Sequence, residues 1–477
     1  MRTLSFDVAV IGAGSAGLTA YRAASAHGKR VLLIESGAYG TTCARVGCMP
    51  SKLLIAAADA AHAIATAPNF GVFAGAPNID GRAVMERVRA ERDRFVGFVV
   101  DGVGRIVPAH RLNGHAKFLA PDRLQVGDDT QVTAQRIVIA SGSRPTIPDN
   151  LRALGDRLIV NDDVFNWDNL PDSVAVVGTG VIGLELGQAL ARLGVRVAIF
   201  GRSGSLAQLH DADVLRVAHD CLRAELDLRL HTTIVSAQRS NEQLTLRTRE
   251  ADGRERSETY QFVLAATGRT PNVAGLGLEH SGLRLNQRGV PIHDPHTMQC
   301  GDSAIFIAGD VGEDRPVLHE AVDEGRIAGD NAARYPLVVD GVRRAAISVA
   351  FTDPQIAVIG QSSRTLTEQR YASGEVAFAD QGRSRVMLQN CGLLKVYGEH
   401  GTHRFLGAEM IGPRAEHLAH LLAWACQNRM TVEQMLEMPF YHPVVEEGLR
   451  TALRDLKEKL VQHVEAIEHC ADCTPGR

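Results

Sequence analysis

The stretch Asp7-Val-Ala-Val-Ile11 runs directly into the glycine-rich turn Gly12-Ala-Gly14-Ser-Ala-Gly17. The apolar run predicts a buried strand, and the pattern behind the turn predicts a helix that ends near residue 27. A second apolar strand at residues 30–34 leads to Glu35. Strand, glycine turn, helix, strand and acid in this order are typical of a Rossmann-like α/β fold that binds a dinucleotide.

The first glycine turn predicts both the kind of ligand and how it is held. Gly12, Gly14 and Gly17 would let the backbone approach a pyrophosphate, and the N-terminus of the following helix favours its negative charge. Glu35 would accept hydrogen bonds from the ribose hydroxyls. Because a carboxylate here repels a 2′-phosphate, the site suits FAD or NAD rather than NADP.

A second fingerprint of the same kind follows. An apolar strand at residues 173–177 leads into the turn Gly178-Thr-Gly180-Val-Ile-Gly183, a helix and a further strand at residues 196–200. Where the first fold has its acid, this one has Gly201, with Arg202 next. A guanidinium without a carboxylate favours a 2′-phosphate, and therefore NADP over NAD. The alternative is that Arg202 is only a solvated loop charge.

Two cysteines lie close together in Thr41-Thr-Cys43-Ala-Arg-Val-Gly-Cys48-Met-Pro-Ser-Lys52. Residues five apart on a regular helix are turned about 140° from each other, so these thiols would point apart on one. A disulfide therefore requires a distorted or pre-helical stretch, which Gly47 permits. We interpret Cys43 and Cys48 as a thiol–disulfide exchange centre. Two buried structural thiols are the alternative.

Bulk composition is that of an ordinary folded protein of about three domains. The 477 residues carry a formal net charge of -4, which favours neither nucleic acid nor a membrane surface as a partner. No apolar run reaches the ~18 residues of a membrane span, and no signal peptide is evident. The eight cysteines do not indicate a disulfide scaffold in so long a chain. We expect a cytoplasmic protein without a metal site.

Residues 42–52, the two glycine turns and the segment Tyr441-His442-Pro443-Val-Val-Glu-Glu447 together resemble the class I pyridine nucleotide–disulfide oxidoreductases. Dihydrolipoamide dehydrogenase, glutathione reductase and mercuric reductase are members, and the resemblance covers nearly the whole chain. It implies an α/β fold with two Rossmann-like dinucleotide-binding domains and a C-terminal α+β dimerisation domain. The implied division is an FAD-binding domain at 1–148 and 272–342, an NAD(P)-binding domain at 149–271, a dimerisation domain at 343–465 and a cysteine-containing tail at 466–477.

The resemblance also implies roles for single residues. Cys48 would face the flavin, and Cys43 would exchange with the substrate. Lys52 would lie near the flavin and pair with Glu185. His442 would be the acid/base, oriented by Glu447 and supplied by the partner subunit, so that a homodimer is implied. The other implied cofactor contacts are Gly12, Gly14, Gly17, Glu35, Thr42, Ala116, Gly142, Asp310 and Leu318 for FAD, and Gly178, Gly180, Gly183, Arg202, Gly268 and Arg269 for the nicotinamide nucleotide.

The function implied is that of an FAD-dependent dithiol/disulfide oxidoreductase, closest to dihydrolipoamide dehydrogenase. Electrons would move between NAD(P)(H), FAD, the cysteine pair and a small dithiol or a lipoyl domain. Alternatives are an NADPH-dependent reductase of other disulfides, of metal ions as in mercuric reductase, or of quinones. A non-catalytic subunit or redox sensor is a third hypothesis. Cys470 and Cys473 would either relay electrons or metal ions or belong to a polar tail without a role.

Overall fold

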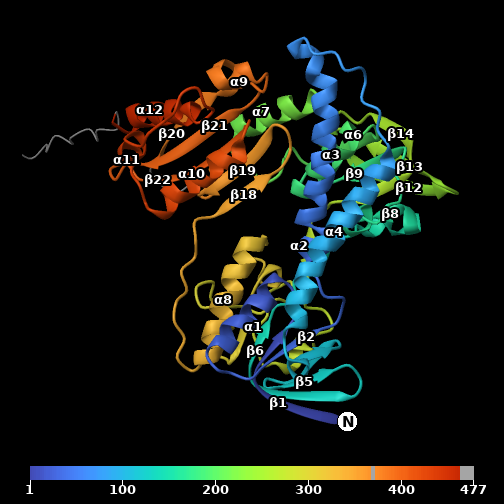
Figure 1. Cartoon of the computed structure of the whole chain (residues 1–477), viewed down its shortest axis with the longest axis vertical. Helices are drawn as coiled ribbons and strands as arrows, with labels where there is room; N and C mark the ends of the chain where they lie inside the picture. The colour runs from blue at the N-terminus through green and yellow to red at the C-terminus, as the bar shows by residue number, and fades with distance from the viewer. Residues whose placement is uncertain (367–370, 462–477) are drawn as a thin grey trace, which may run out of the picture. The chain divides into compact units, whose positions relative to one another are not determined.

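The computed structural model describes residues 1–366 and 371–461 and divides the chain into two compact units (Figure 1). The first contains Met1–Ser203 and Leu226–Arg343, and the second contains Gly204–Glu225 and the chain from Arg344 onward. Each helix of the described residues is too short or too polar to cross a lipid bilayer.

The first sheet of the first unit contains the strand that precedes the first glycine turn. Its order is β3-β2-β1-β6-β5-β4, and β17 pairs with β6. The neighbours β3, β2, β1, β6 and β17 are parallel, whereas β4 and β5 form an antiparallel edge. The strands are β1 (Arg2–Ile11), β2 (Val31–Glu35), β3 (Arg111–Asn113), β4 (Ala116–Ala120), β5 (Arg123–Val126), β6 (Thr130–Ile139) and β17 (Ile305–Ile307).

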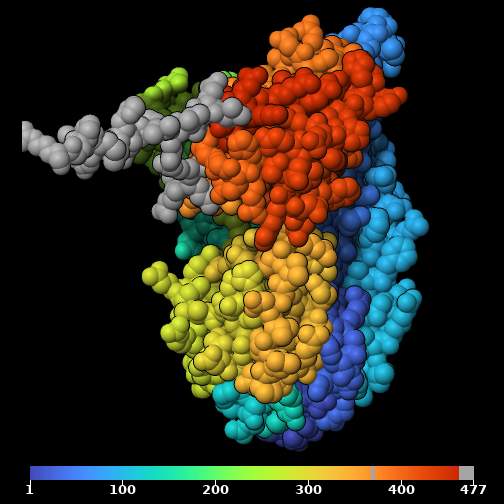
Figure 2. Space-filling view, turned by 90° about the vertical axis from the view of Figure 1, so that its left-hand side faces the viewer, coloured from blue at the N-terminus to red at the C-terminus, as the bar shows by residue number. Residues whose placement is uncertain are grey.

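Helices α1 (Ser15–Ala26) and α8 (Leu318–Arg334) pack closely against each other beside this sheet. Two glycines of α8 make the approach possible, because a Cβ at Gly325 would lie 2.3 Å from the Ala16 oxygen and one at Gly329 would lie 2.4 Å from the Ala20 oxygen. The part of the chain around α8, in light orange, lies at the surface of this unit in Figure 2. The predicted α/β nucleotide fold is therefore present.

The cysteine segment leaves the first sheet as two helices, α2 (Thr42–Val46) and α3 (Cys48–Thr66), and α4 (Gly81–Gly104) follows. Helix α3 packs against α4 and also against α6 (Val181–Arg192), which follows the second glycine turn. The short helix α5 spans Asn161–Val164. Short 3-10 helices occur at Ala67–Phe70, Pro108–His110, Asp149–Arg157, Leu278–His280, Asp310–Gly312 and Phe378–Asp380.

A second parallel sheet carries the second glycine turn. Its order is β11-β10-β9-β15-β8, with strands β8 (Leu158–Ile159), β9 (Ser173–Val177), β10 (Arg196–Phe200), β11 (Asp227–Arg229) and β15 (Phe262–Ala265). An antiparallel sheet of β12 (Thr233–Ser240), β13 (Gln243–Arg249) and β14 (Glu255–Tyr260) accompanies it. The chain crosses between the two parallel sheets on a ribbon of β7 (Ser143–Pro145) and β16 (Arg269–Pro271).

The second unit is built on an antiparallel sheet of order β18-β19-β22-β21-β20. The strands are β18 (Ile347–Ala350), β19 (Gln355–Gly360), β20 (Tyr371–Ala377), β21 (Leu393–Glu399) and β22 (Phe405–Gly412), and the helices are α7 (Ala212–Arg223), α9 (Gly382–Val386), α10 (Ala415–Gln427), α11 (Val432–Leu436) and α12 (Glu447–Val461). Side chains alternate between the two faces of a strand. Leu394 and Val396 belong to the apolar core with α10 and α12, so Lys395 and Tyr397 face the other side, where α7 lies.

The two compact units do not correspond one to one with the three domains drawn from the sequence, because both parallel sheets lie in the first unit and helix α7 lies in the second. Residues 204–225 lie within the predicted 149–271 domain, but in space they belong to the second unit. The reason is packing: Val214, Ala218 and Leu222 are fully buried on one side of a helix that contacts β21 and β22.

Candidate functional site

The first glycine turn is shaped to admit a pyrophosphate. Gly12 has φ +106°, and a Cβ there would lie 2.3 Å from the Ala140 oxygen. A Cβ at Gly17 would lie 1.9 Å from the Gly12 oxygen, whereas nothing lies within 4 Å of one at Gly14. Gly12 and Gly17 thus close the turn, and Gly14 leaves open space at the N-terminus of α1, where a phosphate is favoured.

Glu35 is held at the edge of the same space. Its Oε2 accepts a hydrogen bond from Ala13 N at 2.7 Å, and its Oε1 accepts one from Gly37 N at 2.8 Å. A cavity of about 360 Å³ lies here, lined among others by Gly14, Glu35, Thr42, Ala116 and Gly142. The fixed acid, the open turn and the cavity fit the adenosine and pyrophosphate of FAD.

Asp310 lies at the start of the short turn after β17 and is tied to the crossing ribbon. Its Oδ2 accepts a hydrogen bond from Ser143 Oγ at 2.7 Å. Arg269 donates to the same Ser143 Oγ at 2.8 Å and to the Ser143 backbone oxygen at 2.7 Å. The structure therefore brings Asp310 and Arg269 together through Ser143, a residue that the sequence motifs had not marked. Leu318 is the first residue of α8, which follows this turn.

The two cysteines lie on either side of a helix break. Helix α2 ends at Val46, Gly47 adopts φ −125° and ψ −117°, and Cys48 opens α3. A Cβ at Gly47 would lie 3.1 Å from the Thr42 oxygen, which explains a glycine at the break. Both cysteines are thiols in this structure, which corresponds to the reduced form of the pair. The distortion expected from the sequence is thus a change of helix between the two residues.

The thiols influence each other's ionisation. The hydrogen bond from Cys43 and the positive charge of Lys52 lower the pKa of Cys48 to about 7. The same bond and partial burial raise the pKa of Cys43 well above its ordinary value. Cys48 is therefore the thiolate of the pair near neutral pH, and Cys43 retains its proton.

Lys52 is itself fixed by an acid from the second nucleotide fold. Its Nζ donates to Glu185 Oε2 at 2.7 Å, and Glu185, on α6, is 4% exposed. The structure thus brings Lys52 and Glu185 together one helical turn after Cys48. The positive charge acting on the thiolate is anchored by a buried carboxylate.

The second glycine turn repeats the geometry of the first. A Cβ at Gly178 would lie 2.2 Å from the Ala266 oxygen and one at Gly183 would lie 2.1 Å from the Gly178 oxygen, whereas Gly180 is open. Gly268, directly before β16, has φ +110° and is also open. This turn therefore fits a second pyrophosphate.

The segment after β10 is tightly packed at the position where the first fold has its acid. A Cβ at Gly201 would lie 2.9 Å from Thr179 Cγ2 and 3.0 Å from Leu230 Cδ2. The next residue, Arg202, is exposed. A carboxylate at position 201 would thus require its neighbours to move, whereas the guanidinium is accessible.

His442 and Glu447 form a pair in the second unit. His442 Nδ1 lies 3.0 Å from Glu447 Oε2, and the imidazole is 80% exposed. The hydrogen bond from His442 is the main reason that the pKa of Glu447 is lowered. Since Nδ1 faces the carboxylate, Nε2 is the nitrogen available to a reacting group.

The remaining comparison with the sequence predictions concerns the two tail cysteines, metal ligands and disulfides. Cys470 and Cys473 lie outside the described residues. The described part of the chain contains no group of three or more His, Cys, Asp or Glu side chains able to hold a metal ion. The structure also contains a disulfide that the sequence did not indicate, between Cys221 and Cys391. These two are 170 residues apart, and no local pattern connects them.

The chain belongs to the pyridine nucleotide-disulphide oxidoreductase family, which matches residues 6–325. The dimerisation domain of the same family matches residues 346–453. The family implies FAD and a pyridine nucleotide as cofactors, and the two glycine turns fit both. This protein is therefore a flavoprotein disulfide oxidoreductase.

Proteins from two branches of the family are similar to this chain. It is 29% identical to a dihydrolipoyl dehydrogenase of Haloferax volcanii, over 94% of this chain and 95% of that protein. It is 30% identical to a mercuric reductase of Shigella flexneri, over 96% of this chain and 82% of that protein. Among solved structures, LpdA from Mycobacterium tuberculosis matches with a TM-score of 0.80 at 23% identity, over 95% of this chain and 99% of that one, which supports the fold.

Proposed function

We propose that this protein is a dihydrolipoyl dehydrogenase-like enzyme that oxidises a small dithiol with NAD(P)⁺ as the electron acceptor. The observation that carries the proposal is the cysteine pair divided by a helix break, with the pKa of Cys48 lowered to about 7 in a chain of this family. Bound FAD supplies the two-electron chemistry that links a dithiol to a nicotinamide nucleotide. In this proposal the first glycine turn, Glu35 and Asp310 hold it.

The side chains divide the thiol chemistry between them. Nε2 of His442 of the partner subunit takes a proton from the substrate dithiol, and Glu447 holds the imidazole in the required orientation. The resulting thiolate attacks Cys43 of the oxidised pair, the Cys43–Cys48 bond breaks, and its electron pair leaves on Cys48. The second substrate thiol then displaces Cys43, so that the substrate becomes a disulfide and the pair becomes a dithiol. Lys52 stabilises the Cys48 thiolate.

Lipoamide is the substrate that we place first, free or on a lipoyl domain. The support is the run of dihydrolipoyl dehydrogenases among the relatives, matched over nearly their full length. A metal-ion reductase is the second candidate, because mercuric reductases match at the same level of identity.

Steady-state assays distinguish the candidates. The purified holoenzyme is supplied with lipoamide, glutathione disulfide or Hg²⁺ against NADH and NADPH, and with dihydrolipoamide against both oxidised nucleotides. The proposal predicts the highest kcat/KM with the lipoamide pair, and loss of that activity in Cys43→Ser. A kcat/KM for Hg²⁺ above that for lipoamide would favour the second candidate. Full lipoamide activity in Cys43→Ser would exclude the proposed chemistry.

We further propose that NADP is the preferred nicotinamide nucleotide. Arg202 is exposed close after β10, and the position where an acid would accept a hydrogen bond from a 2′-hydroxyl is occupied by Gly201, whose neighbours would have to move to admit a side chain. Arg202→Gln should therefore raise KM for NADPH about tenfold and leave KM for NADH nearly unchanged. An equal change for both nucleotides would contradict this assignment.

We also propose that the protein acts in the cytoplasm and that it is a homodimer. The dimerisation domain supports the homodimer.

A further inference from the structure

Helix α7 is attached to the second unit at both of its ends. The chain enters this unit at Gly204, directly after the segment containing Gly201 and Arg202, and leaves it at Glu225. Along its length α7 buries Val214, Ala218 and Leu222, the i, i+4, i+8 positions of one helical face. Contacts at the two ends of the helix add to this packing.

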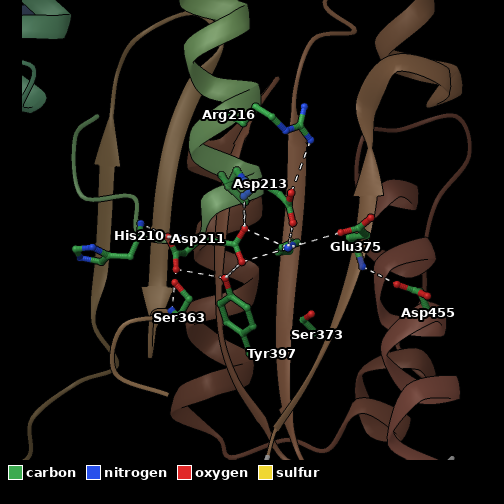
Figure 3. Close-up of polar contacts among 12 residues, drawn as sticks. His210, Asp211, Asp213, Arg216, Ser363, Ser373, Glu375, Tyr397 and Asp455 are labelled. Atoms are coloured by element: carbon green, nitrogen blue, oxygen red, sulfur yellow. Dashed lines mark hydrogen bonds and ion pairs between the residues drawn. The ribbon is translucent and has the colours of Figure 1, made fainter. Parts of the chain in front are cut away.

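The first attachment is an ionic cluster at the N-terminus of α7 (Figure 3). Lys395 of β21 lies 2.6 Å from Asp213 and 3.2 Å from Asp211, and it is only about a tenth exposed. Asp211 also caps the helix, because its Oδ1 accepts hydrogen bonds from the backbone N–H groups of Asp213 and Val214. The cluster therefore connects the start of the helix to the middle of β21.

A fully buried carboxylate completes this attachment. Glu409 of β22, which is directly opposite Lys395, accepts hydrogen bonds from the backbone N–H groups of His210 and Asp211 at 2.6 and 3.0 Å. Its other oxygen accepts from Ser363 N at 2.8 Å and from Tyr397 Oη at 3.3 Å. With these donors present, the carboxylate stabilises the turn that leads into α7.

The second attachment is the disulfide between Cys221, in the last turn of α7, and Cys391, two residues before β21. The helix runs antiparallel to the strand, so its start meets Lys395 and its end meets Cys391. Ten residues of helix span about 15 Å, and four residues of extended chain span about 13 Å, so the two attachments fit one docked helix. The Cα atoms of the two cysteines are 6.0 Å apart.

The two cysteines differ in exposure. Cys391 is exposed, whereas Cys221 is 7% exposed. Attack of an external thiolate is therefore expected at the exposed Cys391, with the buried Cys221 as the leaving group. Cys300 and Cys426 are free cysteines and provide internal standards.

We propose that Cys221 and Cys391 are a second redox couple, which exchanges with small dithiols and their disulfides and sets how firmly α7 is attached to β21. In the reduction, a dithiol thiolate forms a bond to Cys391, the Cys391–Cys221 bond breaks, and the electron pair leaves on Cys221. The second thiol of the dithiol attacks the sulfur now bonded to Cys391, which gives a cyclic disulfide and the Cys391 thiolate. The two protons of the dithiol pass to the two cysteines, and the reverse exchange restores the bond.

The couple would connect the dithiol pool to the nucleotide site. With the disulfide reduced, the contacts at the N-terminal end and the buried face of α7 still attach the helix, but its C-terminal end loses its covalent link and the position of the helix becomes less restricted. This consequence rests on the proposed function, because there Arg202 binds the nicotinamide nucleotide. The exchange itself does not rest on it.

The experiment equilibrates the full-length holoenzyme with mixtures of reduced and oxidised dithiothreitol. Acid-quenched samples are unfolded in denaturant and alkylated with light and then heavy reagent, before and after full reduction, and the peptides are quantified by mass spectrometry. Cys221 and Cys391 should change together from protected to alkylated as the mixture becomes more reducing, and Cys300 and Cys426 should be alkylated throughout. Alkylation of Cys221 and Cys391 in the oxidised protein would overturn the proposal, as would a pair that stays protected in excess dithiothreitol.

Amide hydrogen exchange then measures how firmly α7 is attached to β21. Amides in the last turn of α7 should exchange about tenfold or more faster in dithiothreitol-reduced wild type and in Cys391→Ser than in oxidised wild type. Cys426→Ser, a change of a free thiol in the same unit, should leave α7 unaffected. Equal exchange of α7 in oxidised and reduced wild type would overturn the structural role without depending on any variant. An NADP⁺ dissociation constant equal in both redox forms would overturn the link to the nucleotide site alone.

Discussion

The pKa of Cys48 depends on two neighbours that the helix break and the next turn bring to it. The Cys43 thiol donates a hydrogen bond to its sulfur, and Lys52 supplies a positive charge. Glu185 anchors that charge from α6, so a residue of the second nucleotide fold takes part in tuning a thiol of the first. The sequence identifies these residues by resemblance, but the physical reason for their cooperation is visible only in three dimensions.

Replacing Lys52 tests whether its positive charge stabilises the Cys48 thiolate. Lys52→Met removes the positive charge that lowers the pKa of Cys48, so this pKa should rise by about one unit from about 7. Alkylation of the reduced enzyme by iodoacetamide, measured at Cys48 by mass spectrometry, should become about tenfold slower below neutral pH and approach the wild-type rate in alkaline solution. Lys457→Met, which removes an exposed lysine of α12, is the control. An unchanged pH profile in Lys52→Met would show that the charge has no influence on the thiolate.

Substitutions of Glu447 test how this carboxylate orients His442, the proposed base. Glu447→Gln keeps the size of the side chain but removes the charge that fixes the imidazole of His442. We expect kcat for dithiol oxidation to fall about tenfold or more, with KM nearly unchanged, because orientation of the base matters in the reacting state. Glu447→Asp retains the carboxylate and should recover part of the rate. Equal loss of activity in Glu447→Gln and Glu447→Asp would show that the substitutions disturb the local structure rather than the orientation of the His442 imidazole.

At the scale of elements, each strand–turn–helix unit is predictable because its signals are local. The glycine spacing, the apolar strand and the acid lie within a few dozen residues, and the strands at Ser173–Val177 and Arg196–Phe200 have the bounds expected. Strand β1 is longer than its apolar run, since its N-terminal half pairs with residues 130–134 of β6. Such pairing between distant segments is not encoded locally.

The same limit applies to α7 and to the disulfide. Their partners on β21 lie far along the chain, and Cys221 and Cys391 have no motif around them. Local sequence around α7 does not indicate the sheet that the helix covers. The Cys43–Cys48 pair is the contrasting case, because its helix break follows from Gly47 and from the spacing itself.

Two glycines of the second turn should respond differently to alanine. A Cβ at Gly183 would meet the Gly178 oxygen, so Gly183→Ala should destabilise the fold by about 2 kcal/mol and lower Tm by about 4 °C or more. Gly180 is open in the structure, so Gly180→Ala should leave Tm within about 1 °C. It should instead raise KM for the nicotinamide nucleotide about tenfold, since the methyl group occupies the approach of the pyrophosphate. Calorimetry and steady-state kinetics on both variants check this; a reversed pattern would contradict the assignment of the turn.

For the whole molecule, the proposed site requires residues from two subunits. If His442 of the partner subunit serves Cys43, a heterodimer of Cys43→Ser and His442→Gln chains contains one intact site, whereas each homodimer contains none. Co-expression with two different affinity tags allows the heterodimer to be isolated. Its activity should be about half that of the wild type. Activity no higher than that of the two homodimers would place the acid/base and the thiols in one chain.

The central claim is that Cys43 and Cys48 store an electron pair in addition to the flavin. Anaerobic titration of the oxidised holoenzyme with dithionite, followed by the flavin absorbance and by mass spectrometry of alkylated Cys43 and Cys48, tests it directly. The wild type should take up two electrons more than Cys43→Ser before the flavin is fully bleached, and both cysteines should become alkylated in that interval. Equal electron uptake by the two proteins, with Cys43 and Cys48 alkylated before any reductant is added, would contradict it.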